Sequence, residues 1–480
     1  MTSIRCYQQQ LCEPPPKAPL IDCRVAATTV CGRQDAQEST ISIETPRPAN
    51  LSPRNERLRL LKRFLFSPRG LLVGYLLVHL GFLAYFLVYV FQGQAFSDTN
   101  IYRDWAASGF PQNVQPSPWV YPFAGLLPIW ISGIFGPGPF LAVWVILVSI
   151  LNGVALGVLS GWGKKPEGVR AAWWWLVFIA LLGNLGFARV DGVTAPIVLM
   201  GLSLGVASPF AATAILAFAT WMKVWPAAAL VPLFAVVRDR WKIVAGGAAV
   251  TVLVALAASA LGVTSHLLDF LTTQGSRGMQ LEATFTTPWL WMSVLGLGGA
   301  RMYMNTEINS MQVDGPGSTV ASALMQPLFV VVALAVAGVI FWALHQGKKR
   351  GHEDRSELLL AGALTMVSAF IVFNKVGSPQ FMVWLGPVVA LGLAQDRRGW
   401  RVPAVLLLAI GVATYFIYPL FYDALSHNNP LMAGVLTLRN ILLVVLFVWS
   451  SIRLVRLGRR GAPVADQGLR AGTGSGTAGR

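Results

Sequence analysis

Two carboxylates and a cation stand close together in the stretch SDTNIYRDWA, residues 97–106. Asp98 comes seven residues after Phe91, the end of an apolar segment long enough to cross a bilayer. At a lipid–water boundary, partial desolvation raises the pKa of a carboxylate, which suits Asp98 to act as a general base. The alternative is a solvated or helix-capping aspartate, because Ser, Asp, Thr and Asn all cap helices well. Asp104 is the rival carboxylate, and six residues of helix would turn it away from Asp98.

Two lysines interrupt apolar segments farther along the chain. Lys223, in WMKVWP, joins two segments of about 12 residues, so short that the turn between them would sink below the membrane surface. A cation held there suits a lipid phosphate, and a lysine that snorkels to the surface is the alternative. Lys375 opens a Gly-Ser-Pro break in FNKVGSPQF, where it and the backbone N–H groups of the next helix would form an anion site. Otherwise the break is an ordinary helix-ending turn.

Two further stretches contain arginine among other polar residues. Arg439 lies within the last apolar segment, where a cation is costly unless it is paired or faces a wet cavity. A structural ion pair with a loop acid is the alternative for this residue. The stretch GSRGMQLEAT carries Arg277, Gln280 and Glu282 in a loop between apolar segments, and on its own it is a weak signal.

The elements that must position these residues are apolar helices. Of the 480 residues, 55% are hydrophobic and 12% are charged, against about 25% charged in soluble domains. Apolar windows of about 17–25 residues recur from Leu71 to Val455 without strand-like alternation, so we expect an all-α polytopic membrane protein. The net charge of +16 is explained by basic residues that collect in cytoplasmic loops. We do not expect nucleic acid as a partner, because no aromatic-basic RNA-binding pattern is present.

The basic residues also predict the topology. Six of them between Arg54 and Arg69 place the N-terminus in the cytoplasm and the loop of residues 97–122 outside. Val120–Phe135 is apolar but short, and we interpret it as an interfacial or re-entrant helix, because the basic residues of 164–170 then fall inside. About twelve transmembrane helices are expected, at Leu71–Phe91, Phe140–Ser160, Ala171–Leu185, Val193–Val206, Phe210–Trp221, Pro226–Val237, Ile243–Leu261, Val320–Leu344, Leu358–Val372, Met382–Leu393, Val402–Tyr418 and Leu431–Ile452.

Both ends of the chain are expected to be disordered cytoplasmic tails. Residues 1–53 combine scattered charge with a proline run and no periodicity, and the absence of a compact apolar core near the start argues against a signal peptide. All four cysteines lie in the first 31 residues, at spacings that match no zinc pattern. We therefore expect a tail at 1–53, a transmembrane domain at 54–457 and a second tail at 458–480.

Taken in order, the polar stretches resemble a known family. SDTNIYRDWA…WVYP, WMKVWP, GMQLEAT…PWLW, FNKVGSPQFMVWLGP and LRN are similar to motifs of the polyprenol-phosphate-sugar-dependent membrane glycosyltransferases of family 87, in the GT-C superfamily. The resemblance runs from about Leu71 to Arg453. Members of this family are similar to mannosyltransferases and arabinofuranosyltransferases of actinobacterial cell envelopes. In one departure, FARVDGVTAP, with Arg189 and Asp191, stands where relatives often have Gly-Gln-x-Asn.

The resemblance implies a GT-C-like fold and sugar transfer with inversion at the extracytoplasmic face of the plasma membrane. The donor would be a polyprenyl-phosphate sugar, with mannose foremost, and the acceptor a lipid-linked glycan or envelope polysaccharide. Asp98 matches the essential aspartate of the family's first outer loop and is the expected catalytic base. We expect membrane lipid around the protein, and neither a metal nor a cofactor.

The expected substrate-binding residues surround the same polar stretches. They are Tyr102, Arg103, Asp104, Tyr121, Arg189, Asp191, Lys223, Arg277, Gln280, Glu282, Lys375, Ser378, Gln380 and Arg439. Two other interpretations stay open: an arabinofuranosyltransferase that uses decaprenyl-phosphate-arabinose, and a secondary transporter, which about twelve spans would also fit.

Overall fold

The computed structural model describes most of the central part of the chain. The described residues are 53–92, 96, 98–109, 121–264, 267–268, 270, 278–306, 310–351 and 353–460. The chain divides into two units, Met1–Glu56 and Arg57–Arg480, and only the second is described at length. The expected tails lie almost wholly outside the described residues, so their disorder stays a prediction.

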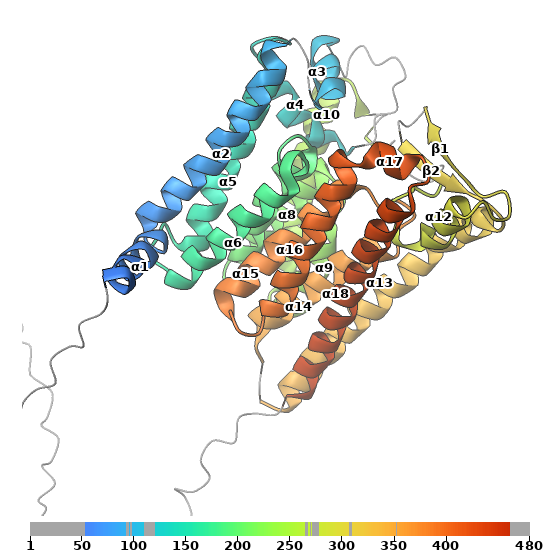
Figure 1. Ribbon diagram of the computed structural model, residues 1–480. Helices are drawn as coiled ribbons and strands as arrows, with labels where there is room; N and C mark the ends of the chain where they lie inside the picture. The colour runs from blue at the N-terminus through green and yellow to red at the C-terminus, as the bar shows by residue number, and fades with distance from the viewer. Residues whose placement is uncertain are drawn as a thin grey trace, which may run out of the picture. The chain divides into compact units, whose positions relative to one another are not determined.

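Helices make up nearly all of the described secondary structure (Figure 1). The α-helices are α1 Pro53–Leu65, α2 Pro68–Phe91, α3 Thr99–Ala107, α4 Leu126–Gly133, α5 Phe140–Ser160, α6 Pro166–Leu182, α7 Val190–Leu204, α8 Pro209–Met222, α9 Ala227–Val236, α10 Arg240–Ala260, α12 Thr287–Val294, α13 Ser318–Lys349, α14 Arg355–Val372, α15 Gly386–Gln395, α16 Arg401–Tyr415, α17 Tyr422–Ser426 and α18 Pro430–Arg459. Shorter helical turns are η1 Phe123–Gly125, η2 Gly183–Gly186, η4 Thr284–Thr286, η5 Pro379–Leu385 and η6 Phe416–Leu420.

The all-α polytopic architecture expected from the sequence is confirmed. Within the described residues, eight helices are long and apolar enough to cross a membrane: α2, α5, α6 with η2, α10, α13, α14, α16 with η6, and α18. The other four expected spans also fall on helices, namely α7, α8, α9 and η5 with α15, but these apolar helices are shorter. The count of twelve crossings therefore stays a prediction.

The segment expected to lie in the interface is short. Its described part forms η1 and α4, which together run from Phe123 to Gly133. Eleven helical residues rise about 16 Å, roughly half the hydrocarbon thickness of a bilayer, so this helix is too short to span alone.

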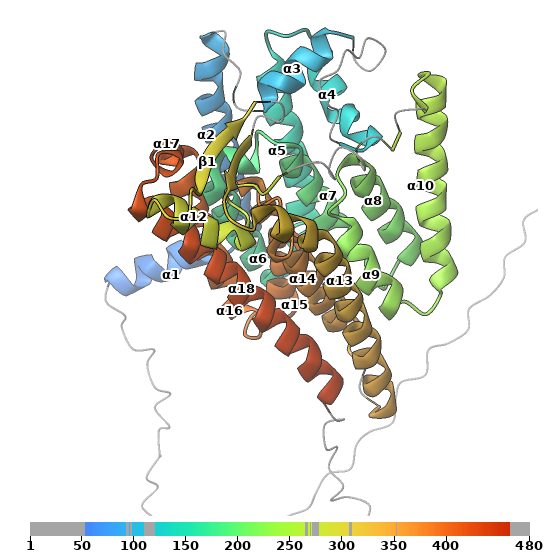
Figure 2. The same cartoon turned by 90° about the vertical axis from the view of Figure 1, so that its right-hand side faces the viewer.

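The helices differ sharply in how much of their surface other helices cover. About 83% of the apolar window of α14 is buried, whereas 22% is buried in each of α2, α10 and α13. Helix α14 packs against α9, α13, α15 and α18, and α10 packs mainly against α8 (Figures 1 and 2). An apolar helix that is mostly uncovered in a membrane protein faces lipid, so α14 is a central helix and the other three face the bilayer.

A β-hairpin stands beside the ends of α12 and α13 (Figure 2). Strands β1, Arg301–Asn305, and β2, Ser310–Asp314, pair antiparallel. On the other side of β2, Gln280 forms a bridge with Gln312, and Leu281 N–H donates to the carbonyl of Met311 at 3.0 Å. The hairpin thus holds the loop of residues 278–283 in place next to the break that follows α14, because Gln280 N–H also donates to the carbonyl of Lys375 at 3.0 Å.

Candidate active site

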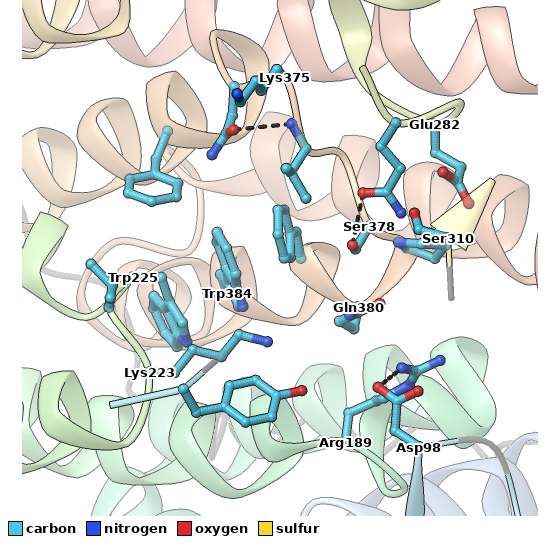
Figure 3. A pocket seen from close by; sticks show the side chains of 18 of the residues that line it. Asp98, Arg189, Lys223, Trp225, Glu282, Ser310, Lys375, Ser378, Gln380 and Trp384 are labelled. Atoms are coloured by element: carbon cyan, nitrogen blue, oxygen red, sulfur yellow. Dashed lines mark hydrogen bonds and ion pairs between the residues drawn. The ribbon is translucent and has the colours of Figure 1, made fainter. Parts of the chain in front are cut away.

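A cavity of about 810 Å³ opens where these polar segments meet. Side chains from α3, the α8–α9 turn, the 278–283 loop, the β-hairpin and the break after α14 line it. Figure 3 shows Asp98, Arg189, Gln380 and Lys223 along one side of the view, with Lys375, Ser378 and Glu282 across from them. The structure therefore brings together five polar stretches that are far apart in sequence, the first at Asp98 and the last at Gln380.

Asp98 enters this cavity as half of an ion pair. It occupies the N-cap position of α3 but makes no capping hydrogen bond, so the capping alternative is not what the structure shows. Its carboxylate instead contacts the guanidinium of Arg189, the residue just before α7 (Figure 3). The side chain of Asp98 is 24% exposed and that of Arg189 is 11% exposed, so the pair is largely removed from water.

Arg189 is also held from a second direction. Its Nη2 donates a hydrogen bond of 3.2 Å to the hydroxyl of Tyr418, and its guanidinium lies 5.9 Å from the centre of that ring. Tyr418 lines the cavity from η6, the helical turn that follows α16. The sequence singled out Tyr418 only as the end of an expected span, since an aromatic residue there is typical of an interfacial anchor.

The rival carboxylate lies elsewhere. The side chain of Asp104 is 68% exposed and pairs with its neighbour Arg103 at 3.2 Å. Neither residue lines the cavity, although both were expected to bind substrate. The six-residue separation turns Asp104 away from Asp98, so only one of the two carboxylates of this helix reaches the cavity.

Tyr102 and Tyr121 form the wall beside Asp98. The two hydroxyls are 2.9 Å apart, and both residues line the cavity. Tyr102 is buried against Trp144 of α5, with ring centres 5.1 Å apart. Burial raises the pKa of Tyr102 well above its ordinary value, so the phenol stays neutral and serves as a hydrogen-bonding group rather than a base.

Lys223 lines the cavity and forms an ion pair with a buried carboxylate. Its Nζ lies 2.7 Å from Oδ2 of Asp191, in the first turn of α7, and Oδ1 of the same aspartate accepts a 2.5 Å hydrogen bond from Trp384 Nε1. The ammonium lies 5.2 Å from the ring centre of Tyr121 and 5.7 Å from that of Phe381. This lysine is therefore a largely buried cation that a carboxylate and aromatic rings hold in place.

Asp191 itself stays behind the cavity wall. It is buried and does not line the cavity, although it was expected to bind substrate. Because its two oxygens accept hydrogen bonds from Lys223 and Trp384, its observed role is to hold the cation in place.

Lys375 lines the opposite part of the cavity and is buried. The two backbone N–H groups that follow it already have hydrogen-bond acceptors, whereas an anion site at the start of the next helix, η5, stays a prediction. The N–H of Val376 donates to the Asn374 side chain at 3.0 Å, and that of Gly377 donates to Gln280 Oε1 at 3.1 Å. Amide side chains thus occupy those two donors, and Lys375 contributes a buried cation to the cavity wall.

Ser378 and Gln380, the other expected residues of this break, both line the cavity. The hydroxyl of Ser378 donates to Gln280 Oε1 at 2.9 Å, which ties the break to the 278–283 loop. Gly377 allows this close approach, because a Cβ at that position would lie 2.3 Å from Cα of Ala283.

Glu282 is a buried carboxylate on the cavity wall. Its Oε1 accepts a hydrogen bond of 2.7 Å from Tyr422, whereas its buried Oε2 has no hydrogen-bond partner among the described residues. Burial raises the pKa of Glu282, and burial together with the nearby carboxylate raises that of Tyr422. Tyr422 was not predicted from the sequence, which offered only an aromatic residue near a helix end.

Arg439 supports this loop from behind. It is buried in α18, donates to the backbone carbonyl of Glu282, and its Nε donates to Asn440 Oδ1 at 3.1 Å. It does not line the cavity, so the structure places it away from the surface where a phosphate was expected to bind. Arg277, the remaining expected residue, lies outside the described residues.

Part of the cavity wall is apolar. Met325 and Phe329 of α13, Phe370 of α14, Phe373 directly after α14, and Trp225 after α8 all line it. Helix α13 is one of the lipid-facing helices, so this apolar wall lies on the side of the cavity nearest the bilayer. In the part of the chain that the structure describes, no group of three or more His, Cys, Asp or Glu residues could hold a metal ion.

Comparison with models of protein families identifies a family for this chain. The model described as glycosyltransferase family 87 matches residues 119–373, a little over half of the chain. Neither the curated proteins nor the solved structures give a match. The matched region includes the α8–α9 turn with Lys223, the 278–283 loop and α14.

Proposed function

Because the chain belongs to glycosyltransferase family 87, we propose that it transfers a sugar from a polyprenyl-phosphate donor to a lipid-linked glycan or an envelope polysaccharide. Mannose is the first candidate for the sugar, and arabinofuranose is the alternative. The choice of mannose rests on the resemblance of the polar motifs to those of envelope mannosyltransferases.

The composition of the cavity supports this donor class. One continuous cavity combines a carboxylate, Asp98, with the cations Arg189, Lys223 and Lys375 and with an apolar wall from α13 and α14. A polyprenyl-phosphate sugar has the matching parts: a hydroxyl-rich sugar, an anionic phosphate and an apolar chain. Hydroxyls and phosphate call for hydrogen-bonding and cationic groups, and the chain calls for apolar surface.

Asp98 is proposed as the general base. As the oxygen of the acceptor hydroxyl forms a bond to the anomeric carbon, its proton passes to the Asp98 carboxylate. The bond between the anomeric carbon and the phosphate oxygen breaks at the same time, and its electron pair leaves with the polyprenyl phosphate. Attack opposite the leaving group inverts the anomeric centre, as in glycosidases that use one carboxylate as base.

The cations are proposed to hold the departing phosphate. Lys223 is fixed by Asp191 and by aromatic rings, so its ammonium needs little reorganisation to stabilise the negative charge that develops on the leaving group. Lys375 faces the same cavity from the other side. Arg439 is better suited to support the Glu282 loop than to contact the phosphate, because it does not line the cavity.

The membrane and the side of the reaction are proposals too. Charge sorting places the loop that bears Asp98 outside, so the reaction would occur at the extracytoplasmic face of the plasma membrane. This arrangement agrees with a donor whose lipid chain stays in the bilayer while its sugar faces the periplasm or cell wall.

Sugar transfer by the reconstituted full-length protein tests the proposal. Vesicles that contain the protein would receive labelled polyprenyl-phosphate mannose or arabinose together with a glycolipid extract as acceptor. We expect label to appear in the glycolipid fraction with mannose as donor. Incorporation from the arabinose donor alone would show that arabinose is the transferred sugar. Movement of the intact donor or of free sugar across the vesicle membrane without incorporation would support a transporter instead.

A further inference from the structure

The proposed base is bound to a cation of the same cavity. The carboxylate of Asp98 pairs with the guanidinium of Arg189, and both side chains line the cavity. A carboxylate in contact with a guanidinium is a weaker proton acceptor than the same carboxylate alone, because the contact stabilises its charged form. The pair lies mostly out of water, where attraction between charges is screened less.

The two ion pairs of the cavity differ in where their carboxylates lie. Lys223 pairs with Asp191, which stays behind the wall, so a ligand in the cavity can contact this cation without displacing its partner. Arg189 pairs with Asp98, and here the carboxylate and the guanidinium both face the cavity. An anion that binds Arg189 must therefore compete with Asp98.

A phosphate is a strong competitor for a guanidinium. Arginine presents parallel N–H donors that match the oxygens of phosphate as well as those of carboxylate. Arg189 would stay in position during such an exchange, because its Nη2 also donates to the hydroxyl of Tyr418.

We propose that Arg189 exchanges partners during the reaction. It pairs with Asp98 before the donor binds and with the donor phosphate afterwards, so Asp98 becomes a competent base only in the donor complex. The acceptor hydroxyl is then activated only when a sugar is in place to receive it, and the donor binds before the acceptor is activated. This inference rests on the proposed function, and it adds a phosphate ligand and an order of events.

The exchange is tested by phosphate binding in a double-mutant cycle. A short-chain isoprenyl monophosphate is titrated into the full-length protein in detergent, and its Kd is measured for the wild type, Asp98→Asn, Arg189→Gln and the double variant. We expect Asp98→Asn to bind about tenfold more tightly, because the competing carboxylate is gone, and Arg189→Gln to bind about tenfold more weakly. In the Arg189→Gln background, Asp98→Asn should change the Kd little.

The opposite outcomes overturn the proposal. If Asp98→Asn tightens binding equally in the double variant, Asp98 only repels the phosphate and no exchange occurs. Unchanged Kd values for both single variants would place the phosphate away from this pair. Should Arg189→Gln fail to fold, Arg189→Lys replaces it, and the tightening caused by Asp98→Asn must then shrink without vanishing.

Two controls separate this inference from the proposed function. Arg170→Gln removes one partner of a solvent-exposed ion pair with Glu167 and should leave the Kd unchanged. Inorganic phosphate, titrated in parallel, should bind more weakly than the isoprenyl phosphate, since it lacks the apolar chain, and equal affinity would mean that only the anion is recognised. If the wild type transfers sugar but shows no coupling in the cycle, the exchange fails and the function stands. If it binds no isoprenyl phosphate, both fail.

Discussion

Asp98 and Asp104 lie at one short helix and meet different surroundings. Asp98 faces a cavity and a guanidinium, whereas Asp104 faces solvent and its neighbour Arg103. The same contrast separates Lys223, which Asp191 fixes at 2.7 Å, from the surface lysines of the chain. Chemistry at this site therefore depends on which charges are buried and partnered, and residue type alone does not decide it.

Removal of the Lys223 charge should weaken donor binding far more than acceptor binding. We expect Lys223→Met to raise the Kd of a non-reactive donor analogue by about ten- to hundredfold, because a charge-assisted contact to the phosphate is lost. The measurement is a titration of purified protein with donor analogue and, separately, with acceptor. Lys242→Met is the matched control, since Lys242 pairs with Asp239 at an exposed site. Normal donor affinity in Lys223→Met would place the phosphate elsewhere.

The buried carboxylate of Glu282 predicts a pH dependence of stability. Burial raises its folded-state pKa above the ordinary value of 4.5, so the folded protein retains a proton that the unfolded chain has released. Between those two pKa values, the free energy of unfolding therefore falls as the pH rises. Glu282→Gln is neutral at every pH and can still accept the Tyr422 hydrogen bond. The melting temperature of the wild type should therefore decrease as the pH rises through this range, and that of Glu282→Gln should not.

The measurement for Glu282 is a series of thermal melts in detergent across the acidic and neutral range. Glu167→Gln, at a half-exposed helix position, controls for the loss of one carboxylate. Parallel curves for the wild type, Glu282→Gln and Glu167→Gln would show that Glu282 does not titrate differently in the folded protein.

At the scale of elements, the break after α14 positions one wall of the cavity. The 278–283 loop approaches it so closely that Gly377 has no room for a side chain. The same loop is tied to β2 by a backbone hydrogen bond from Leu281 to Met311 and to α18 by Arg439. The position of Lys375 and Ser378 thus depends on contacts between segments that are distant in sequence.

Gly377→Ala should destabilise the protein at this break. The new Cβ would lie 2.3 Å from Cα of Ala283, a backbone atom that cannot move without its loop, so a cost of about 1–3 kcal/mol is expected. The control is Gly434→Ala in α18, where nothing lies within 4 Å of the new Cβ and the higher helix propensity of alanine should be neutral or stabilising. Thermal melts of both variants check this, and equal melting temperatures would contradict the close approach.

Apolar length and charge in the sequence predicted the elements well and the site only in part. Phe140–Ser160 was expected as a span and forms α5 with the same bounds. An uninterrupted apolar run in a membrane must satisfy its backbone hydrogen bonds internally, and a helix does so. Lys223 and Lys375 stood out as cations within apolar sequence, and both line the cavity. The partners of these residues could not be predicted, because Asp191 and Trp384, which fix Lys223, are brought there by packing of separate helices.

Other features of the site were beyond reach of the sequence for the same physical reason. The sequence showed that Arg439 needs a partner or a wet cavity, but the loop that it supports comes from more than 150 residues away. Tyr418 and Tyr422 carry no sequence signal that separates a cavity tyrosine from an interfacial anchor. Four expected spans are helices of 10–17 residues, and length alone does not say whether such helices cross the bilayer.

At the scale of the whole molecule, the topology predicted from the basic residues would place the cavity at the extracytoplasmic side of the membrane. We predict that Ser108, near Asp98, faces the extracytoplasmic side and that Gly163, between α5 and α6, faces the cytoplasm. Single cysteines at these positions, in a background where the four native cysteines are serine, would be labelled in intact cells with a membrane-impermeant maleimide. We expect labelling at Ser108 only. Labelling of both from the same side would contradict this topology and the non-spanning assignment of Val120–Phe135.

Sugar transfer by Asp98→Asn tests the proposed chemistry most directly. The substitution keeps the shape of the side chain and removes the proton acceptor, so the variant should fold, reach the membrane and bind donor, yet lose about 10²–10⁴ in turnover. Asp104→Asn, at the exposed end of the same helix, should transfer sugar at close to the wild-type rate. Near-normal turnover by Asp98→Asn, with Asp104→Asn inactive, would move the base to Asp104. Near-normal turnover by both variants would remove this loop from the reaction.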